Sequence, residues 1–149
     1  MYAYLRLAAL VLLLPGFWIP HTMSDTALRE VVIQSVGNEL KFAQTEFTVK
    51  TGEEVRLIFE NKASAPGLSH NVVIVRREED IDRVGLAAIQ AAENDYIPED
   101  EAILFYTPLA APGETVETTF TAPAPGTYYY TCTFPGHYVL MRGVMKVTA

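Results

Sequence analysis

The side chains best suited to chemistry gather in one short segment near the C-terminus. Cys132, His137 and Met141 place a thiol, an imidazole and a thioether within ten residues. A thiolate, two imidazoles and a weak, distant thioether are the donors of a mononuclear blue copper site that transfers electrons. The second imidazole would come from His70, which lies about sixty residues upstream at the start of an expected strand. The spacing therefore predicts a metal site built from His70, Cys132, His137 and Met141.

Other roles for these residues explain less of the pattern. A lone cysteine at a strand end is most often a small buried hydrophobe, but Pro135-Gly136 beside His137 makes a tight exposed loop that a core does not need. A cysteine nucleophile with a histidine base is the enzyme alternative. The loop offers no acidic or amide group to orient that base, and Met141 would have no role. Zinc bound by Cys132 and two histidines is the other metal alternative, although a thioether is a poor zinc ligand.

Short strands separated by turn residues must position these donors. Alternating or β-branched segments predict strands over residues 28–33, 47–49, 55–59, 70–75, 102–107, 115–121, 127–133 and 143–147. Seven to eight strands are the number that a two-sheet sandwich needs. The predicted fold class is therefore all-β.

One segment departs from the β pattern. Residues 78–94 are rich in Ala, Leu and acidic side chains, and their apolar residues recur near helical spacing. We expect one short helix inserted between strands, around residues 80–94. Asp80 or Asp82 is available as its N-cap.

The composition excludes several classes of protein. The 149 residues, half of them hydrophobic, are enough for one domain with a real core. A net charge of -7 argues against nucleic acid as a partner. The single cysteine excludes an internal disulfide and a four-thiolate metal site. Three histidines are too few for an enzyme with a second copper centre, and a binuclear copper centre would need a second cysteine.

The N-terminus carries the features of a targeting segment. A short basic start, residues 1–6, precedes an uncharged apolar run over residues 7–19. As a helix this run would span about 20 Å, less than the bilayer's hydrocarbon core of about 30 Å. We therefore assign residues 1–23 to an export signal or a membrane anchor, and residues 24–149 to the folded domain, with a linker over about 24–29. The domain is expected in the periplasm or on the outer face of the cytoplasmic membrane.

The two candidate metal segments resemble those of the cupredoxins, in particular azurins and auracyanins. Residues 132–137 followed by Leu140-Met141 are similar to the azurin copper loop, and Ser69-His70-Asn71 resembles the segment that carries the first histidine. The insertion at 78–94 falls where azurins have a helical flap, so the resemblance covers roughly residues 31–148. Azurins also have a disulfide near the N-terminus, which the lone Cys132 excludes, and in this respect the chain is closer to the auracyanins.

The resemblance implies a Greek-key β-sandwich that binds one type 1 copper ion. Cys132, His70 and His137 would form the trigonal plane, with Met141 as the long axial ligand. The carbonyl of Ser69, where azurins have a glycine, would be a weak fifth ligand. Two further contacts are implied: a hydrogen bond from Asn71 toward Thr133, and backbone N–H groups near Met141 on the Cys132 sulfur.

The implied function is electron transport rather than enzyme catalysis. Redox proteins such as cytochromes, or membrane respiratory or photosynthetic complexes, would be the partners. They would dock on the uncharged segments 65–68 and 138–140 around the edge of His137. A copper-binding or copper-delivery protein without an electron-transfer role is the alternative, and ready exchange of the metal would distinguish it.

Overall fold

The computed structural model describes residues 28–149. The predicted signal or anchor over residues 1–23 and most of the predicted linker lie outside the described residues. Within residues 28–149, no helix is long and apolar enough to cross a membrane.

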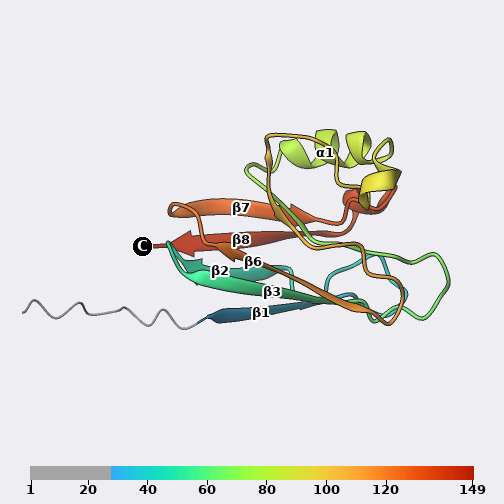
Figure 1. Ribbon diagram of the computed structural model, residues 1–149, viewed down its shortest axis with the longest axis horizontal. Coiled ribbons are helices and arrows are strands. Elements are labelled where there is room, and N and C mark those ends of the chain that lie inside the picture. Colours follow the sequence, from blue (N-terminus) through green and yellow to red (C-terminus); the bar gives the residue numbers. More distant parts are fainter. Residues whose placement is uncertain (1–27) are drawn as a thin grey trace, which may run out of the picture.

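Two facing sheets make up most of the described chain (Figure 1). In the three-stranded sheet, β3 lies between β1 and β6, and β1 runs parallel to β3. The five-stranded sheet has the order β2-β8-β7-β4-β5, with β2 parallel to β8. The strands are β1 (Arg29–Gln34), β2 (Glu46–Lys50), β3 (Glu54–Glu60), β4 (Val73–Val75), β5 (Ile103–Tyr106), β6 (Thr115–Thr121), β7 (Gly126–Thr131) and β8 (Arg142–Thr148). The prediction of an all-β sandwich is confirmed.

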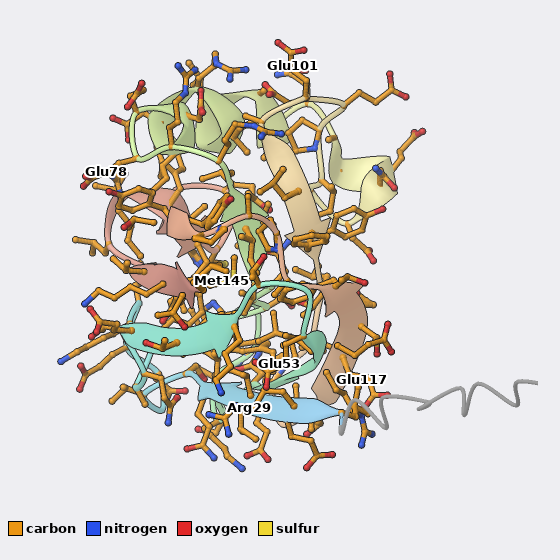
Figure 2. All side chains as sticks on the ribbon, turned by 90° about the vertical axis from the view of Figure 1, so that its left-hand side faces the viewer. Arg29, Glu53, Glu78, Glu101, Glu117 and Met145 are labelled. Carbon is orange, nitrogen blue, oxygen red and sulfur yellow. The ribbon has the colours of Figure 1, made fainter. Side chains whose placement is uncertain are left out.

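The main core lies between the two sheets and follows from the alternation in their strands. In β3, Val55, Leu57 and Phe59 are fully buried, whereas Arg56 and Ile58 between them are partly exposed. Figure 2 shows Met145 in the interior, while Glu117 projects outward. Burying each large apolar side chain contributes about 1.5–3 kcal/mol to the stability of the fold. The sandwich is therefore a stiff frame for the loops at its ends.

A helix covers the outer face of β4 and explains why this strand has no polar side chain. Ile74 joins the main core, whereas Val73 and Val75 pack with Ile81 and Val84 of α1 (Asp80–Ala88) in a second cluster. Both faces of β4 are thus buried.

The predicted helix over 80–94 is too long. Helix α1 ends at Ala88, and a separate 3₁₀ turn, η1 (Ala92–Asn94), follows it. Burial explains the break, because Ala88 is the last residue of the segment that packs inward, and the residues of η1 are exposed. Helix-forming composition alone does not extend a helix beyond the surface that it covers.

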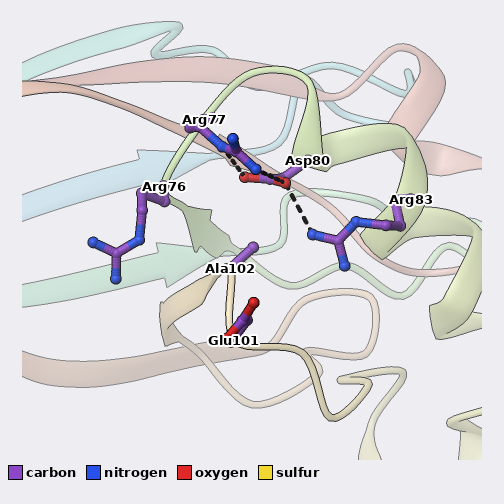
Figure 3. A pocket seen from close by; sticks show the side chains of 6 residues that line it. All are labelled: Arg76, Arg77, Asp80, Arg83, Glu101 and Ala102. Carbon is purple, nitrogen blue, oxygen red and sulfur yellow. Dashed lines mark hydrogen bonds and ion pairs between the residues drawn. The ribbon is translucent and has the colours of Figure 1, made fainter.

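The predicted N-cap is also wrong. Glu79 occupies that position without a side-chain cap, and Asp80 lies inside the helix. The buried Asp80 carboxylate instead accepts hydrogen bonds from Arg77 at 3.0 Å and Arg83 at 2.9 Å (Figure 3). These bonds, above all those from Arg77, lower the pKa of Asp80. Arg83 also pairs with Asp100, so the network ties the start of α1 to the segment before β5.

The strand predicted over 70–75 begins only at Val73. His70 instead forms an isolated bridge with Ala110, in which each backbone N–H donates to the other residue's carbonyl at 3.0 and 2.8 Å. Cys132 likewise lies just past the end of β7. Both residues therefore sit at strand ends, in loops fixed by the sheet.

Candidate metal centre

Strand register brings the sequence-distant donors to one end of the sandwich. In the five-stranded sheet, Val73 of β4 pairs with Thr131 of β7, and Thr131 pairs with Arg142 of β8. Cys132 follows the first strand of this β7–β8 pair and Met141 precedes the second. The β7–β8 connection lies at the end of the sandwich opposite the C-terminus (Figure 1). It contains η2 (His137–Val139), which begins with the second histidine.

Three of the predicted donors converge. The Cys132 sulfur lies 3.8 Å from His70 Nδ1 and 3.6 Å from His137 Nδ1, and the two Nδ1 atoms are 3.1 Å apart. His70 and Cys132 are fully buried, and His137 is 6% exposed. Among the described residues, this is the cluster of histidine, cysteine and acidic side chains arranged to hold a metal ion.

The polar groups of the cluster fit a bound cation. Two imidazoles that turn their Nδ1 atoms toward each other and toward a sulfur can share at most one hydrogen between those nitrogens. A cation would use the lone pairs of all three donor atoms. Sulfur and imidazole nitrogen are the donors that copper and zinc prefer. A neutral imidazole that uses Nδ1 as a ligand carries its hydrogen on Nε2, and His70 Nε2 is buried with no hydrogen-bond partner among the described residues.

Burial sets the protonation of the donors in the metal-free protein. It raises the pKa of the Cys132 thiol to about 12, while the backbone N–H groups of Asn71 and Phe134 act in the opposite direction. Burial, together with the neighbouring His137, lowers the pKa of His70 to about 4, and burial also lowers the pKa of His137. Both imidazoles are therefore uncharged at neutral pH, and each can offer a nitrogen lone pair to a metal ion. Metal binding must displace the thiol proton.

The backbone N–H groups near Met141, which were predicted to reach the Cys132 sulfur, donate elsewhere. Those of Leu140 and Met141 both donate to the His137 carbonyl, at 3.0 and 2.9 Å. Met141 interacts with the cysteine through the backbone, because the Cys132 N–H donates to the Met141 carbonyl at 3.2 Å. Thr131 Oγ1 donates to the same carbonyl at 2.9 Å.

The predicted contact between Asn71 and Thr133 is confirmed. The Thr133 N–H donates to Asn71 Oδ1 at 2.8 Å, and Asn71 Nδ2 lies 2.9 Å from Thr133 Oγ1. Asn71 Nδ2 also donates to the Asp95 carbonyl at 3.2 Å. Asn71, the residue after His70, is therefore hydrogen-bonded both to the residue after Cys132 and to the turn after η1.

A second buried asparagine, Asn61, was not predicted. Its Nδ2 donates to the carbonyls of Leu68 and Ala110 at 2.8 and 3.0 Å, and its Oδ1 accepts from the Ala63 N–H at 3.0 Å. It thereby joins the loop before His70 to Ala110, the residue that bridges to His70. An asparagine directly after an alternating apolar strand was the available signal, since such residues often organise a turn through backbone contacts.

The turn that carries His137 depends on a glycine. Gly136 has φ 82°, a left-handed conformation that residues with a Cβ adopt at a cost. The chain then reverses, and the His137 N–H donates to the Phe134 carbonyl at 2.9 Å. The Phe134 ring lies against His137, with centroids 4.8 Å apart.

Comparison with known proteins agrees with this geometry. Residues 29–148 match the family described as copper binding proteins, plastocyanin/azurin family. Auracyanin-A of Chloroflexus aurantiacus is 45% identical over 122 residues, which cover 78% of this chain and 73% of that protein. The structure of auracyanin A, a "blue" copper protein from the same bacterium, has a TM-score of 0.76 and 41% identity, covering 81% of this chain and 99% of that one.

A second solved structure, the dithionite-reduced auracyanin of Roseiflexus castenholzii, has a TM-score of 0.75 and 41% identity, covering 80% of this chain and 97% of that one. The matched region includes both ligand segments. The chain thus belongs to the plastocyanin/azurin family of copper-binding proteins, with His70, Cys132 and His137 placed to bind one copper ion.

Proposed function

We propose that the protein carries single electrons between redox partners, with copper alternating between Cu(I) and Cu(II). The observation that carries this proposal is the buried convergence of one thiol and two neutral imidazoles in a chain of this family. Copper bound there supplies a one-electron couple. The protein needs no reaction of its own for this role, which fits a carrier rather than an enzyme.

The surrounding residues act by holding the donors still. Asn71 bridges the two ligand segments, and Asn61 fixes the loop before His70. The two N–H groups on the Cys132 sulfur stabilise its thiolate form. A centre whose donors move little between oxidation states requires little reorganisation for each electron.

Two further ligands belong to the proposal. Met141 is fully buried and packs in the same core cluster as Cys132, and we assign it the weak axial position. The Ser69 carbonyl, next to His70, is assigned the weak fifth position.

Electrons would enter and leave at the edge of His137, where 6% of the residue reaches solvent. Val139 and Leu140, on the same turn, are 58% and 66% exposed. An exposed apolar patch of this kind often marks a partner site. We propose transient docking of redox proteins there, such as cytochromes or membrane respiratory or photosynthetic complexes.

The proposed place of action is outside the cytoplasm, in the periplasm or on the outer face of the membrane. The basic start and the apolar run over residues 7–19 support export, with a tether as the other use of the same segment.

An absorption spectrum with voltammetry of the copper-loaded protein tests the function. We expect an intense visible thiolate-to-copper band, a narrow-hyperfine paramagnetic signal and a reversible one-electron wave. Cys132→Ser should abolish the band, because the charge transfer starts on sulfur, whereas Thr133→Ser, which keeps a hydroxyl beside Asn71, should retain it. A colourless protein would contradict the copper site. Ready loss of copper to a chelator without a reversible wave would instead support copper delivery.

A further inference from the structure

Helix α1 contacts the ligand turn, residues 137–141, and the residue that follows it. The Tyr138 ring packs on Gly85, where a Cβ would lie 2.1 Å from Tyr138 Cγ. The second contact is made by Arg142, the first residue of β8, which pairs with Asp82 of α1. The fold thus places the helix against the turn that carries His137 and Met141 (Figure 1).

The Arg142 guanidinium makes two different contacts. Its Nε donates to the Tyr138 carbonyl of the turn at 2.7 Å, and its terminal nitrogen donates to the Asp82 carboxylate. A planar guanidinium presents several N–H donors in a fixed fork, so one side chain can serve both acceptors at once. A lysine in its place has a single ammonium and a more flexible stem.

The Tyr138 carbonyl differs from two other carbonyls of the turn, which accept hydrogen bonds from groups other than Arg142. The His137 carbonyl already accepts the N–H groups of Leu140 and Met141, at 3.0 and 2.9 Å. The Met141 carbonyl accepts from Cys132 and Thr131. Among the described residues, the Arg142 side chain supplies the donor to the Tyr138 carbonyl, and it alone connects the turn's backbone to a charged group of α1.

We propose that Arg142 is a positioning residue, which holds the ligand turn against α1 through the Tyr138 carbonyl and Asp82. The turn and the helix then open and close as one unit. The pair with Asp82 is solvent-exposed and contributes little energy by itself; its role is to aim the guanidinium at the carbonyl. The effect of Arg142 on the metal rests on the proposed function, whereas its contacts with Tyr138 and Asp82 do not depend on a bound metal.

Amide hydrogen exchange in the metal-free protein tests the assignment without copper. In Arg142→Gln, the N–H groups of Leu140 and Met141 should exchange about tenfold faster, since tenfold corresponds to about 1.4 kcal/mol, the size of one hydrogen bond. Arg142→Lys should fall between Gln and the parent. Asp82→Asn should speed the same two amides by a smaller factor.

Lys146→Gln is the matched control. It also removes one positive charge from β8 and breaks an exposed ion pair, between Lys146 and Glu46 at 2.7 Å. The Val144 N–H, which donates to the Thr45 carbonyl, reports general loosening of the strand. Equal exchange at Leu140 and Met141 in Arg142→Gln and Lys146→Gln would overturn the assignment. So would acceleration at Val144 by the same factor, or an Asp82→Asn protein identical to the parent.

A second readout uses the copper-loaded protein. Arg142→Gln should release copper to a chelator several-fold faster than Lys146→Gln, with Arg142→Lys between them. Equal release rates in the three variants would contradict a positioning role. If the parent protein showed no reversible copper wave, the proposed function would fail while the exchange result still stood.

Discussion

At the scale of single residues, burial decides the chemistry of the donors. His70 and Cys132 are fully buried, and burial favours the uncharged form of each. It therefore lowers the pKa of the imidazole and raises the pKa of the thiol. Each is therefore an uncharged group that becomes a ligand without first disrupting an ion pair. The same burial makes the stability of the metal-free protein depend on pH.

The first prediction concerns that dependence. The unfolded chain binds a proton at His70 below pH about 6.5, whereas the folded chain excludes it until about pH 4. The unfolded state thus holds more protons in this window, and stability falls as the pH drops, by at most about 1.4 kcal/mol per pH unit. Denaturant unfolding of the metal-free protein at pH 7, 5.5 and 4.5 should show this slope. His70→Gln should be less sensitive to pH, and an unchanged slope would refute the assignment to His70.

The second prediction concerns Met141. A weak axial donor stabilises Cu(II) more than Cu(I), so Met141→Leu should keep the visible band and raise the reduction potential. Each tenfold shift in preference toward Cu(I) raises the potential of a one-electron couple by about 59 mV. Met145→Leu, another fully buried methionine, is the control and should leave the potential unchanged. Loss of copper from Met141→Leu would show that the residue is not a weak axial ligand.

At the scale of secondary-structure elements, α1 is attached to the sandwich more firmly than its nine residues suggest. Its apolar side packs on β4, its first turn is held by the buried Asp80, and its middle meets the Tyr138 ring at Gly85. Gly85 is buried because the ring occupies the place of a side chain. The helix therefore packs closely, through Gly85, on the Tyr138 ring of the turn that carries His137 and Met141.

The third prediction tests this fit. Gly85→Ala would favour an isolated helix by about 1 kcal/mol, but here the added Cβ would meet the ring, so we expect a net loss of about 1–3 kcal/mol. Ala87→Gly, at an exposed position of the same helix, should cost about 1 kcal/mol through propensity alone. In a Tyr138→Ala background the penalty of Gly85→Ala should disappear. Denaturant unfolding checks all three, and a stabilised Gly85→Ala protein would contradict the close fit.

Sequence patterns predicted the strands well because their signal is local. Alternation marks the buried side of β3, and soft donors at fixed spacing mark the metal turn. The end of α1 was missed because Ala91 and Ala92 continue the helical composition beyond Ala88, the last buried residue of the helix. The roles of Asn61 and Arg142 depend on which distant groups the fold brings within reach: Ala110 lies 49 residues from Asn61, and Asp82 lies 60 residues from Arg142. The position of Asn61 after an apolar strand signals a turn, but a single sequence does not show which distant residues these side chains reach.

At the scale of the whole molecule, the turn beside His137 is apolar, although α1 also exposes Leu86 and Ile89 among its charged residues. Val139 and Leu140 are exposed beside His137, whereas acidic residues gather on α1 and the segment before β5. Figure 2 shows Glu78 and Glu101 on that side of the molecule. With a net charge of -7, the acidic surface should affect how often partners meet, and the apolar surface how they finally dock.

The fourth prediction separates these two effects in stopped-flow electron transfer to a purified redox partner. Leu140→Asp and Leu68→Asp should slow transfer by about tenfold or more at every ionic strength, with an unaltered copper spectrum, because a carboxylate would be desolvated in the contact. Reversing the charge of Glu78 and Glu79 to lysine should mainly change the salt dependence of the rate. Unchanged rates in both aspartate variants would place docking elsewhere.

The two ends of the described chain offer a practical consequence. Arg29 pairs with Val55 at the start of β3. The start of β1 and the end of β8 both lie at the end of the sandwich opposite the β7–β8 connection (Figure 1). A cysteine-free affinity tag placed after Ala149 would therefore attach the protein to a gold or graphite electrode with its metal end toward the solution. Such a film would present every molecule in the same orientation and leave the His137 edge free for soluble mediators.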